Sequence, residues 1–122
     1  KIVSRGISIG EIGVTGKARI IKNNLDISLI CPGEILFVPK ELMKNIPLSK
    51  NIAGIVTNQN VNDVYALFNK NNKKISTICN LENMDNHQIS NGDLITLQLN
   101  EGVIYMGQIE DDDDAIDKYK YV

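Results

Sequence analysis

A strand–helix–strand pattern in the middle of the chain constrains the fold most. Gly54–Thr57 is a short apolar stretch that is reached through Ala53 and followed by polar residues, which is typical of a buried strand. Asp63 then supplies a helix N-cap, and the apolar residues that follow it share one face of a helix predicted over residues 63–71. After a polar turn, Ile75–Cys79 returns as a strand. Buried strands that alternate with helices predict a mixed α/β domain.

The segments on either side of this pattern are predicted to be mostly strands. Upstream, Lys17–Lys22 and Ile35–Val38 are strand candidates, and residues 41–46 suit a short helix that ends near a proline. Downstream, Leu94–Leu99 and Val103–Tyr105 are joined by an Asn- and Gly-containing turn, which predicts a hairpin. The prediction is therefore a compact domain of about six short strands and two short helices.

Composition and charge exclude several classes of protein. With 122 residues, nineteen of them Ile and none Trp, the chain can build one domain around an aliphatic core. Residues 110–122 carry six acids and two lysines, so the remaining part has eleven bases against nine acids, a net charge of about +2. That balance predicts no nucleic-acid partner. No apolar run approaches the roughly 20 residues of a membrane span, so no membrane partner is expected.

The remaining reactive residue types predict no metal site and no cofactor. Cys31 and Cys79 lie 48 positions apart without a Cys-x-x-Cys motif, so they are expected to be buried free thiols, with a disulfide as the alternative. Free thiols indicate a reducing compartment, the cytoplasm or an organelle interior. The Asp111–Asp114 run lacks the spacing of a calcium loop and is expected to be solvated linker.

These observations divide the chain into a domain over residues 1–109 and an acidic tail or linker over residues 110–122. No signal peptide is visible. Because the chain starts at Lys1 rather than Met, we expect a piece of a longer protein, whose targeting segment could lie upstream.

Several sequence motifs occur in an order that resembles one family. They are Ser8-Ile-Gly10, Gly16-Lys-Ala-Arg19, Pro32-Gly-Glu-Ile-Leu36, the central segment 54–67 and Asn91-Gly-Asp-Leu-Ile-Thr96. Together they resemble the phosphohistidine, or swivelling, domain of phosphoenolpyruvate-utilising enzymes. That family includes phosphoenolpyruvate synthase, pyruvate phosphate dikinase and the extra C-terminal domain of some pyruvate kinases. The resemblance covers nearly the whole domain and implies a compact β/β/α swivelling fold.

The family's phosphate-accepting residues are replaced in this chain. Aligned without a gap, the phosphorylated His of the family falls on Tyr65. The surrounding family positions, which are two glycines, a hydroxyl residue, a Ser or Cys and an Arg, are occupied here by Asn60, Val61, Asp63, Val64 and Asn71. The resemblance therefore implies a degenerate site with no catalytic residue.

The replacement of His by Tyr65 works against phosphoryl transfer. A neutral imidazole nitrogen is nucleophilic near pH 7, whereas a phenol with a pKa of about 10 needs a base. Asp63 also puts a carboxylate where a phosphate would need positive potential. Tyr65 is instead expected to be an exposed or half-buried residue in the first turn of a helix, and His87 an exposed loop residue.

Three functions remain open at this point. The first is a non-catalytic structural or regulatory domain of a larger pyruvate kinase-like or phosphoenolpyruvate-utilising phosphotransferase. Its partners would be the other domains of the parent enzyme, with possible homo-oligomer contacts. The second is an active phosphoryl carrier that uses Tyr65 or His87. The third is an unrelated α/β binding module, which would lack a strand at residues 54–57 that leads into a helix at residues 63–71.

Overall fold

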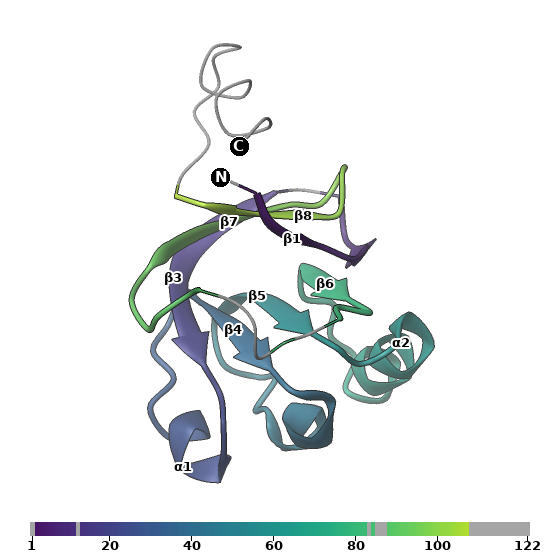
Figure 1. Ribbon diagram of the computed structural model, residues 1–122. Coiled ribbons are helices and arrows are strands. Elements are labelled where there is room, and N and C mark those ends of the chain that lie inside the picture. Colours follow the sequence, from purple (N-terminus) through teal and green to yellow (C-terminus); the bar gives the residue numbers. More distant parts are fainter. Residues whose placement is uncertain (1, 12, 83, 85–87, 108–122) are drawn as a thin grey trace.

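The computed structural model describes residues 2–11, 13–82, 84 and 88–107 (Figure 1). In this part of the chain, eight strands form one curled sheet in the order β1-β8-β7-β3-β4-β5-β6-β2. The strands are β1 (Ile2–Arg5), β2 (Ile7–Ile9), β3 (Val14–Ile20), β4 (Glu34–Val38), β5 (Ile52–Thr57), β6 (Thr77–Cys79), β7 (Leu94–Gln98) and β8 (Val103–Met106). The helices are α1 (Asn24–Ile27), the 3-10 helix η1 (Lys40–Asn45) and α2 (Val61–Lys70).

The centre of the sheet is parallel and is covered on both faces. Strands β3, β4, β5 and β6 run parallel to one another in sequence order, and α1, η1 and α2 connect them. Figure 1 shows the helices on one side of these strands and β1, β7 and β8 on the other. Every residue of β4 is buried, as expected of a parallel strand between two layers. The predicted mixed α/β class with β/β/α layering is confirmed.

Each face of the parallel strands carries its own apolar core. On the helix side, Leu36 and Val38 of β4 pack with Val64 and Phe68 of α2. On the other side, residues of β4 pack with residues of β7 and β8. This second cluster consists of Ala18, Ile35, Phe37, Val56, Ile78, Leu81, Ile89, Ile95, Leu97, Leu99 and Ile104. The core is aliphatic apart from a few aromatic rings, as the composition predicts.

The two edges of the sheet meet at Gly6. Strand β1 pairs with β8 and strand β2 pairs with β6, although Gly6 alone separates β1 from β2 in the chain. The Gly6 N–H donates to the backbone oxygen of Gly102 at 2.8 Å. A Cβ atom at position 6 would lie 2.4 Å from the backbone oxygen of Cys79 and 2.7 Å from Cγ2 of Ile78. Only glycine fits where the edges meet.

Several predicted boundaries are wrong for identifiable reasons. Asn60, not Asp63, is the N-cap of α2, because the Asn60 side chain accepts from the Asp63 N–H and the helix begins at Val61. Strand β3 starts and ends earlier than predicted, and β6 starts two residues later. Strands β1 and β2 and helix α1 were not predicted, because short elements among glycines and polar residues show no periodicity. The helix predicted at residues 41–46 is the 3-10 helix η1.

The prediction for the two cysteines is correct for one of them. Cys79 is buried and free, but Cys31 is free and exposed. Cys31 lies in the turn that contains Pro32 and Gly33, before β4 begins. A connecting turn at the surface leaves a small apolar side chain exposed, which the composition argument does not consider.

Gly6 provides a test of sheet closure. We expect Gly6→Ala to lower the free energy of unfolding by roughly 1–3 kcal/mol, and Gly6→Val by more, because each adds atoms where the backbone of β6 leaves no room. Gly33→Asn is the control, since no atom lies within 4 Å of a Cβ at Gly33 and Asn tolerates its positive φ. Urea unfolding followed by circular dichroism measures all three variants. A Gly6→Val protein as stable as the natural chain would contradict closure at Gly6.

Candidate functional site

The candidate site lies where β5 leads into α2, at the carboxyl edge of the parallel strands. This edge is where open α/β sheets bind ligands. Hydrogen bonds hold the connecting loop: the Gln59 N–H donates to Oγ1 of Thr57 at 3.1 Å, and the Asn80 N–H donates to the Gln59 backbone oxygen at 2.9 Å. Oδ1 of Asn58 accepts from the Lys40 N–H at 2.8 Å. The loop is therefore fixed to the segments that follow β4, β5 and β6.

The side chains of Asn60 and Asp63 form hydrogen bonds at the start of α2. Oδ1 of Asn60 accepts from the Asp63 N–H at 2.9 Å, and Nδ2 of Asn60 donates to Oδ2 of Asp63 at 2.9 Å. The Val64 N–H donates to the Asn60 backbone oxygen at 3.1 Å. The negative charge of Asp63 is favourable at the helix N-terminus, where it complements the helix dipole. The same charge repels a second anion.

The remaining residues of the aligned site have structural contacts. Val64 is 0% exposed and packs in the helix-side core, against which Val61 also packs. Tyr65 is 42% exposed and falls in the second turn of α2, not the first, because the helix begins at Val61. Asn71 is the C-cap residue, and its Nδ2 donates to the Leu67 backbone oxygen at 2.8 Å. Asn60 and Asn71 thus lie at opposite ends of a ten-residue helix, about 15 Å long.

The structure therefore brings Asn60 and Asp63 into contact but leaves Asn71 remote from them. Cys79 is no substitute nucleophile, because burial raises the pKa of its thiol to about 11 and the thiol donates to the Ile7 backbone oxygen at 3.2 Å. His87 and the tail at residues 110–122 lie outside the described residues.

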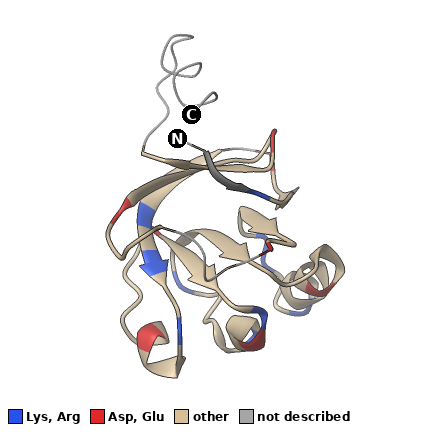
Figure 2. Cartoon of the chain, in the orientation of Figure 1, with Lys and Arg blue, Asp and Glu red and all other residues tan. Residues whose placement is uncertain are grey.

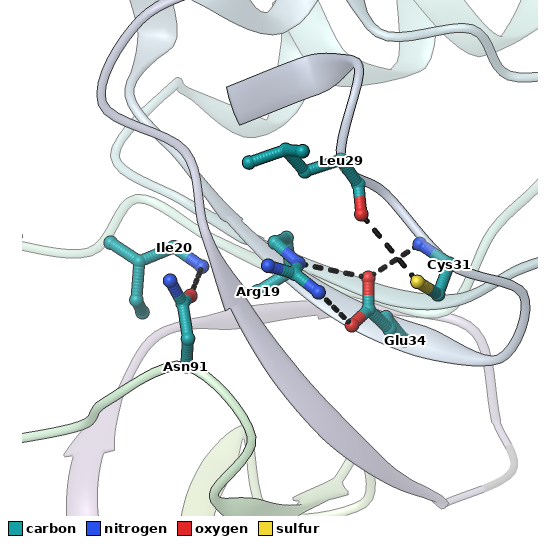
Figure 3. Close-up of polar contacts among 6 residues, drawn as sticks. All are labelled: Arg19, Ile20, Leu29, Cys31, Glu34 and Asn91. Carbon is teal, nitrogen blue, oxygen red and sulfur yellow. Dashed lines mark hydrogen bonds and ion pairs between the residues drawn. The ribbon is translucent and has the colours of Figure 1, made fainter. Parts of the chain in front are cut away.

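An ion pair between two of the recognised sequence motifs was not predicted (Figure 3). Arg19 of β3 donates from Nε to Oε1 of Glu34 at 3.1 Å and from Nη2 to Oε2 at 2.9 Å. The backbone N–H of Cys31 donates to Oε1 of Glu34 at 2.7 Å. Glu34 begins β4, the parallel neighbour of β3. The pair fastens β3 to the turn before β4.

The protonation of Glu34 follows from these contacts. Burial alone would raise the pKa of this carboxyl, but the hydrogen bonds from Arg19 and from the Cys31 N–H outweigh burial. The net result is a pKa below the ordinary value, and the hydrogen bond to Glu34 raises the pKa of Arg19. The two groups therefore form a charged, bidentate pair in the folded protein.

A third recognised motif, which begins at Asn91, forms hydrogen bonds with β3. Oδ1 of Asn91 accepts from the Ile20 N–H at 2.6 Å, and the Gly92 N–H donates to the Ala18 backbone oxygen at 2.9 Å. The Ala18 N–H donates to the Asp93 backbone oxygen at 2.8 Å. Motifs far apart in the sequence thus converge on β3, as Figure 3 shows for Arg19 and Asn91. These hydrogen bonds hold the segment before β7 against β3.

The described residues contain neither a metal-binding cluster nor a membrane-spanning helix. No group of three or more His, Cys, Asp or Glu side chains there could hold a metal ion. None of the helices in the same residues is long and apolar enough to cross a membrane.

Comparison with known proteins finds similarity to a pyruvate kinase. No protein-family model matches the chain. The chain is 27% identical over 108 residues to Pyruvate kinase 2 of Synechocystis sp. (strain ATCC 27184 / PCC 6803 / Kazusa). The match covers 88% of this chain and 18% of the relative, so the chain spans about a fifth of the length of that enzyme. The similarity therefore concerns one region of a pyruvate kinase.

The ion pair predicts how stability depends on pH. The folded-state pKa of Glu34 lies below the ordinary carboxyl value of 4.5, so its contribution is complete above pH 4.5 and is lost as the pH falls through the lower, folded-state pKa. Glu34→Gln should lower the free energy of unfolding at pH 7 by roughly 1–3 kcal/mol, because it leaves Arg19 without its charged partner. Urea unfolding at a series of pH values below 7 measures both effects.

The control is Glu82→Gln, which removes an exposed carboxylate. Glu82→Gln should be as stable as the natural chain at pH 7 and should lose the same amount of stability in acid. Glu34→Gln should lose less stability than the natural chain below pH 4.5. Equal acid dependence in the natural chain and Glu34→Gln would show that Glu34 does not carry this effect.

Proposed function

We propose that this chain is a non-catalytic, phosphohistidine-like swivelling domain with a structural or regulatory role in a larger pyruvate kinase-like enzyme. The similarity to a pyruvate kinase over 88% of the chain supports the kind of parent enzyme. The β/β/α layers support the kind of domain, since β5 and α2 lie where the family pattern requires a strand and a helix. The presence of this strand and helix argues against an unrelated binding module.

One observation carries the proposal: the Asn60–Asp63 cap occupies the start of α2, where the resemblance puts the residues that would receive the phosphate. An anion site at a helix start needs free backbone N–H groups and positive potential. Here the Asp63 N–H is bonded to Asn60, and the Asp63 carboxylate is held beside the helix start by a second hydrogen bond. An incoming phosphate would have to displace this cap and approach a like charge.

Tyr65 also lacks the surroundings of an activated nucleophile. A phenol needs a base within hydrogen-bond reach to react near neutral pH. The α2 residues three and four positions from Tyr65 are Val61, Asn62, Phe68 and Asn69, and none of them is a general base. A phosphate ester on tyrosine would also be a poor carrier, because it returns its phosphoryl group slowly.

The proposed structural role needs a surface for the rest of the parent enzyme. Leu25 of α1 is 78% exposed, and Leu29, just after α1, is 56% exposed. Exposed large apolar side chains close to one another are favoured contact points for a neighbouring domain or subunit. We therefore propose that the α1 region packs against another domain of the parent enzyme.

Phosphoryl labelling of the parent enzyme tests the proposal. With radiolabelled phosphoenolpyruvate or ATP, we expect neither acid-labile nor acid-stable label on this segment after proteolysis, because Tyr65 has no general base among its neighbours on α2 and the helix start is already capped. A known phosphohistidine domain treated in parallel is the positive control. Acid-labile label that disappears in His87→Ala would establish His87 as a carrier. Acid-stable label that disappears in Tyr65→Phe would establish Tyr65 as the acceptor.

A further inference from the structure

We propose that a hollow beside α2 binds a small anion that carries two or more negative charges. The hollow has a volume of about 290 Å³ and lies between η1 and one flank of α2. Its lining residues are Lys40, Lys44, Gln59, Asp63, Ala66, Leu67 and Lys70. Figure 2 shows both basic residues in blue and acidic residues in red on η1 and α2. Gln59 and Asp63 of this lining also belong to the loop and the helix start of the candidate site, whereas the three lysines do not.

Three positive charges face the hollow without acidic partners. Lys40 and Lys44 lie four positions apart on η1, and Lys70 lies in the last turn of α2. In the part of the chain that the structure describes, Arg19–Glu34 is the only ion pair within 4.0 Å, so none of these lysines is neutralised by a direct partner. Like charges held together in this way raise the local concentration of anions.

Asp63 is the one acidic side chain in the lining, and it does not cancel the excess. Its Oδ2 accepts from Nδ2 of Asn60 at 2.9 Å, and it lies in the first turn of α2. The lysines therefore outnumber the carboxylate three to one around the hollow. A ligand with two or three negative charges could pair with several ammonium groups at once, whereas a chloride ion could not.

The hollow shares Gln59 and Asp63 with the candidate site, but it does not include Tyr65, the aligned acceptor. Asp63, Ala66, Leu67 and Lys70 follow the i, i+3, i+4, i+7 spacing of one helix flank. At 3.6 residues per turn, Tyr65 points roughly 150° around α2 from the centre of that flank. The proposal goes beyond the proposed function because it concerns reversible binding of a free anion. The labelling experiment measures covalent phosphorylation, so the two results are distinguishable.

The dimensions and lining define the class of ligand. Pockets for drug-sized ligands run from roughly 300 to 1,000 Å³, so this hollow is at the small end. Ala66 and Leu67 offer apolar contact for a short carbon skeleton between the lysines. A small phosphate ester and a polycarboxylate both combine several negative charges with a short carbon skeleton.

Calorimetric titration of the 122-residue chain at low ionic strength tests the site. Pyrophosphate and citrate are the probes, and sodium chloride at matched ionic strength is the blank. We expect saturable binding of at least one probe, weakened roughly two- to five-fold by each of Lys40→Gln, Lys44→Gln and Lys70→Gln. The triple variant should lose binding altogether. Binding of pyrophosphate alone would identify a phosphate site, and binding of citrate alone a carboxylate site.

The matched control is the triple variant Lys50→Gln, Lys73→Gln, Lys74→Gln. It removes three exposed lysines that do not line the hollow, so the change in net charge is the same. We expect this control to bind the probe as the natural chain does. Equal loss in both triple variants would show general attraction to net charge and would overturn the proposal. Absence of saturable binding by both probes, or single variants that bind like the natural chain, would overturn it as well.

Discussion

Closure of the sheet at Gly6 is the constraint on which the other contacts depend. Strands β1 and β2 are consecutive in the chain but pair with β8 and β6, so one short N-terminal segment joins both edges of the sheet. This arrangement leaves few unpaired strand edges and holds the antiparallel layer over one face of the parallel strands. The contact is close from both sides, since a Cβ at Gly102 would lie 2.3 Å from the Gly6 backbone oxygen. The second core lies between the antiparallel layer and the parallel strands, which this corner joins.

The contacts that hold β3 and the proposed degenerate site lie in different parts of the domain. Arg19, Glu34 and Asn91 connect β3 to its neighbours on one side of the molecule (Figure 3). The Asn60–Asp63 cap lies at the start of α2 and involves none of these residues. The proposal therefore requires only that the exposed aligned positions, such as Asn60 and Asp63, can change without loss of the contacts around β3. The structure gives α2 a good polar cap where an anion site would need vacant N–H groups.

The sequence predicts those elements whose signal is local. Strands β4 and β5 and helix α2 follow from apolar runs and helical spacing, and the final hairpin follows from its Asn- and Gly-containing turn. The cap of α2 was misplaced because Asn60 and Asp63 are both good N-cap residues. The Arg19–Glu34 ion pair was missed because two opposite charges fifteen positions apart do not indicate a contact by themselves. The contact follows only once β3 and β4 are known to be adjacent. The lysine-lined hollow was missed for the same reason, since η1 and α2 meet only in the folded chain.

The central claim is that the acceptor position has been dismantled as a unit, so that Tyr65 is only one of several obstacles. The most direct measurement is the mass of this segment from a Tyr65→His parent enzyme after incubation with phosphoenolpyruvate or ATP. Because the Asn60–Asp63 cap remains in that variant, we predict no phosphoryl adduct and an unchanged mass. An adduct on the introduced histidine would contradict the account, since it would show that the site lacked only its nucleophile.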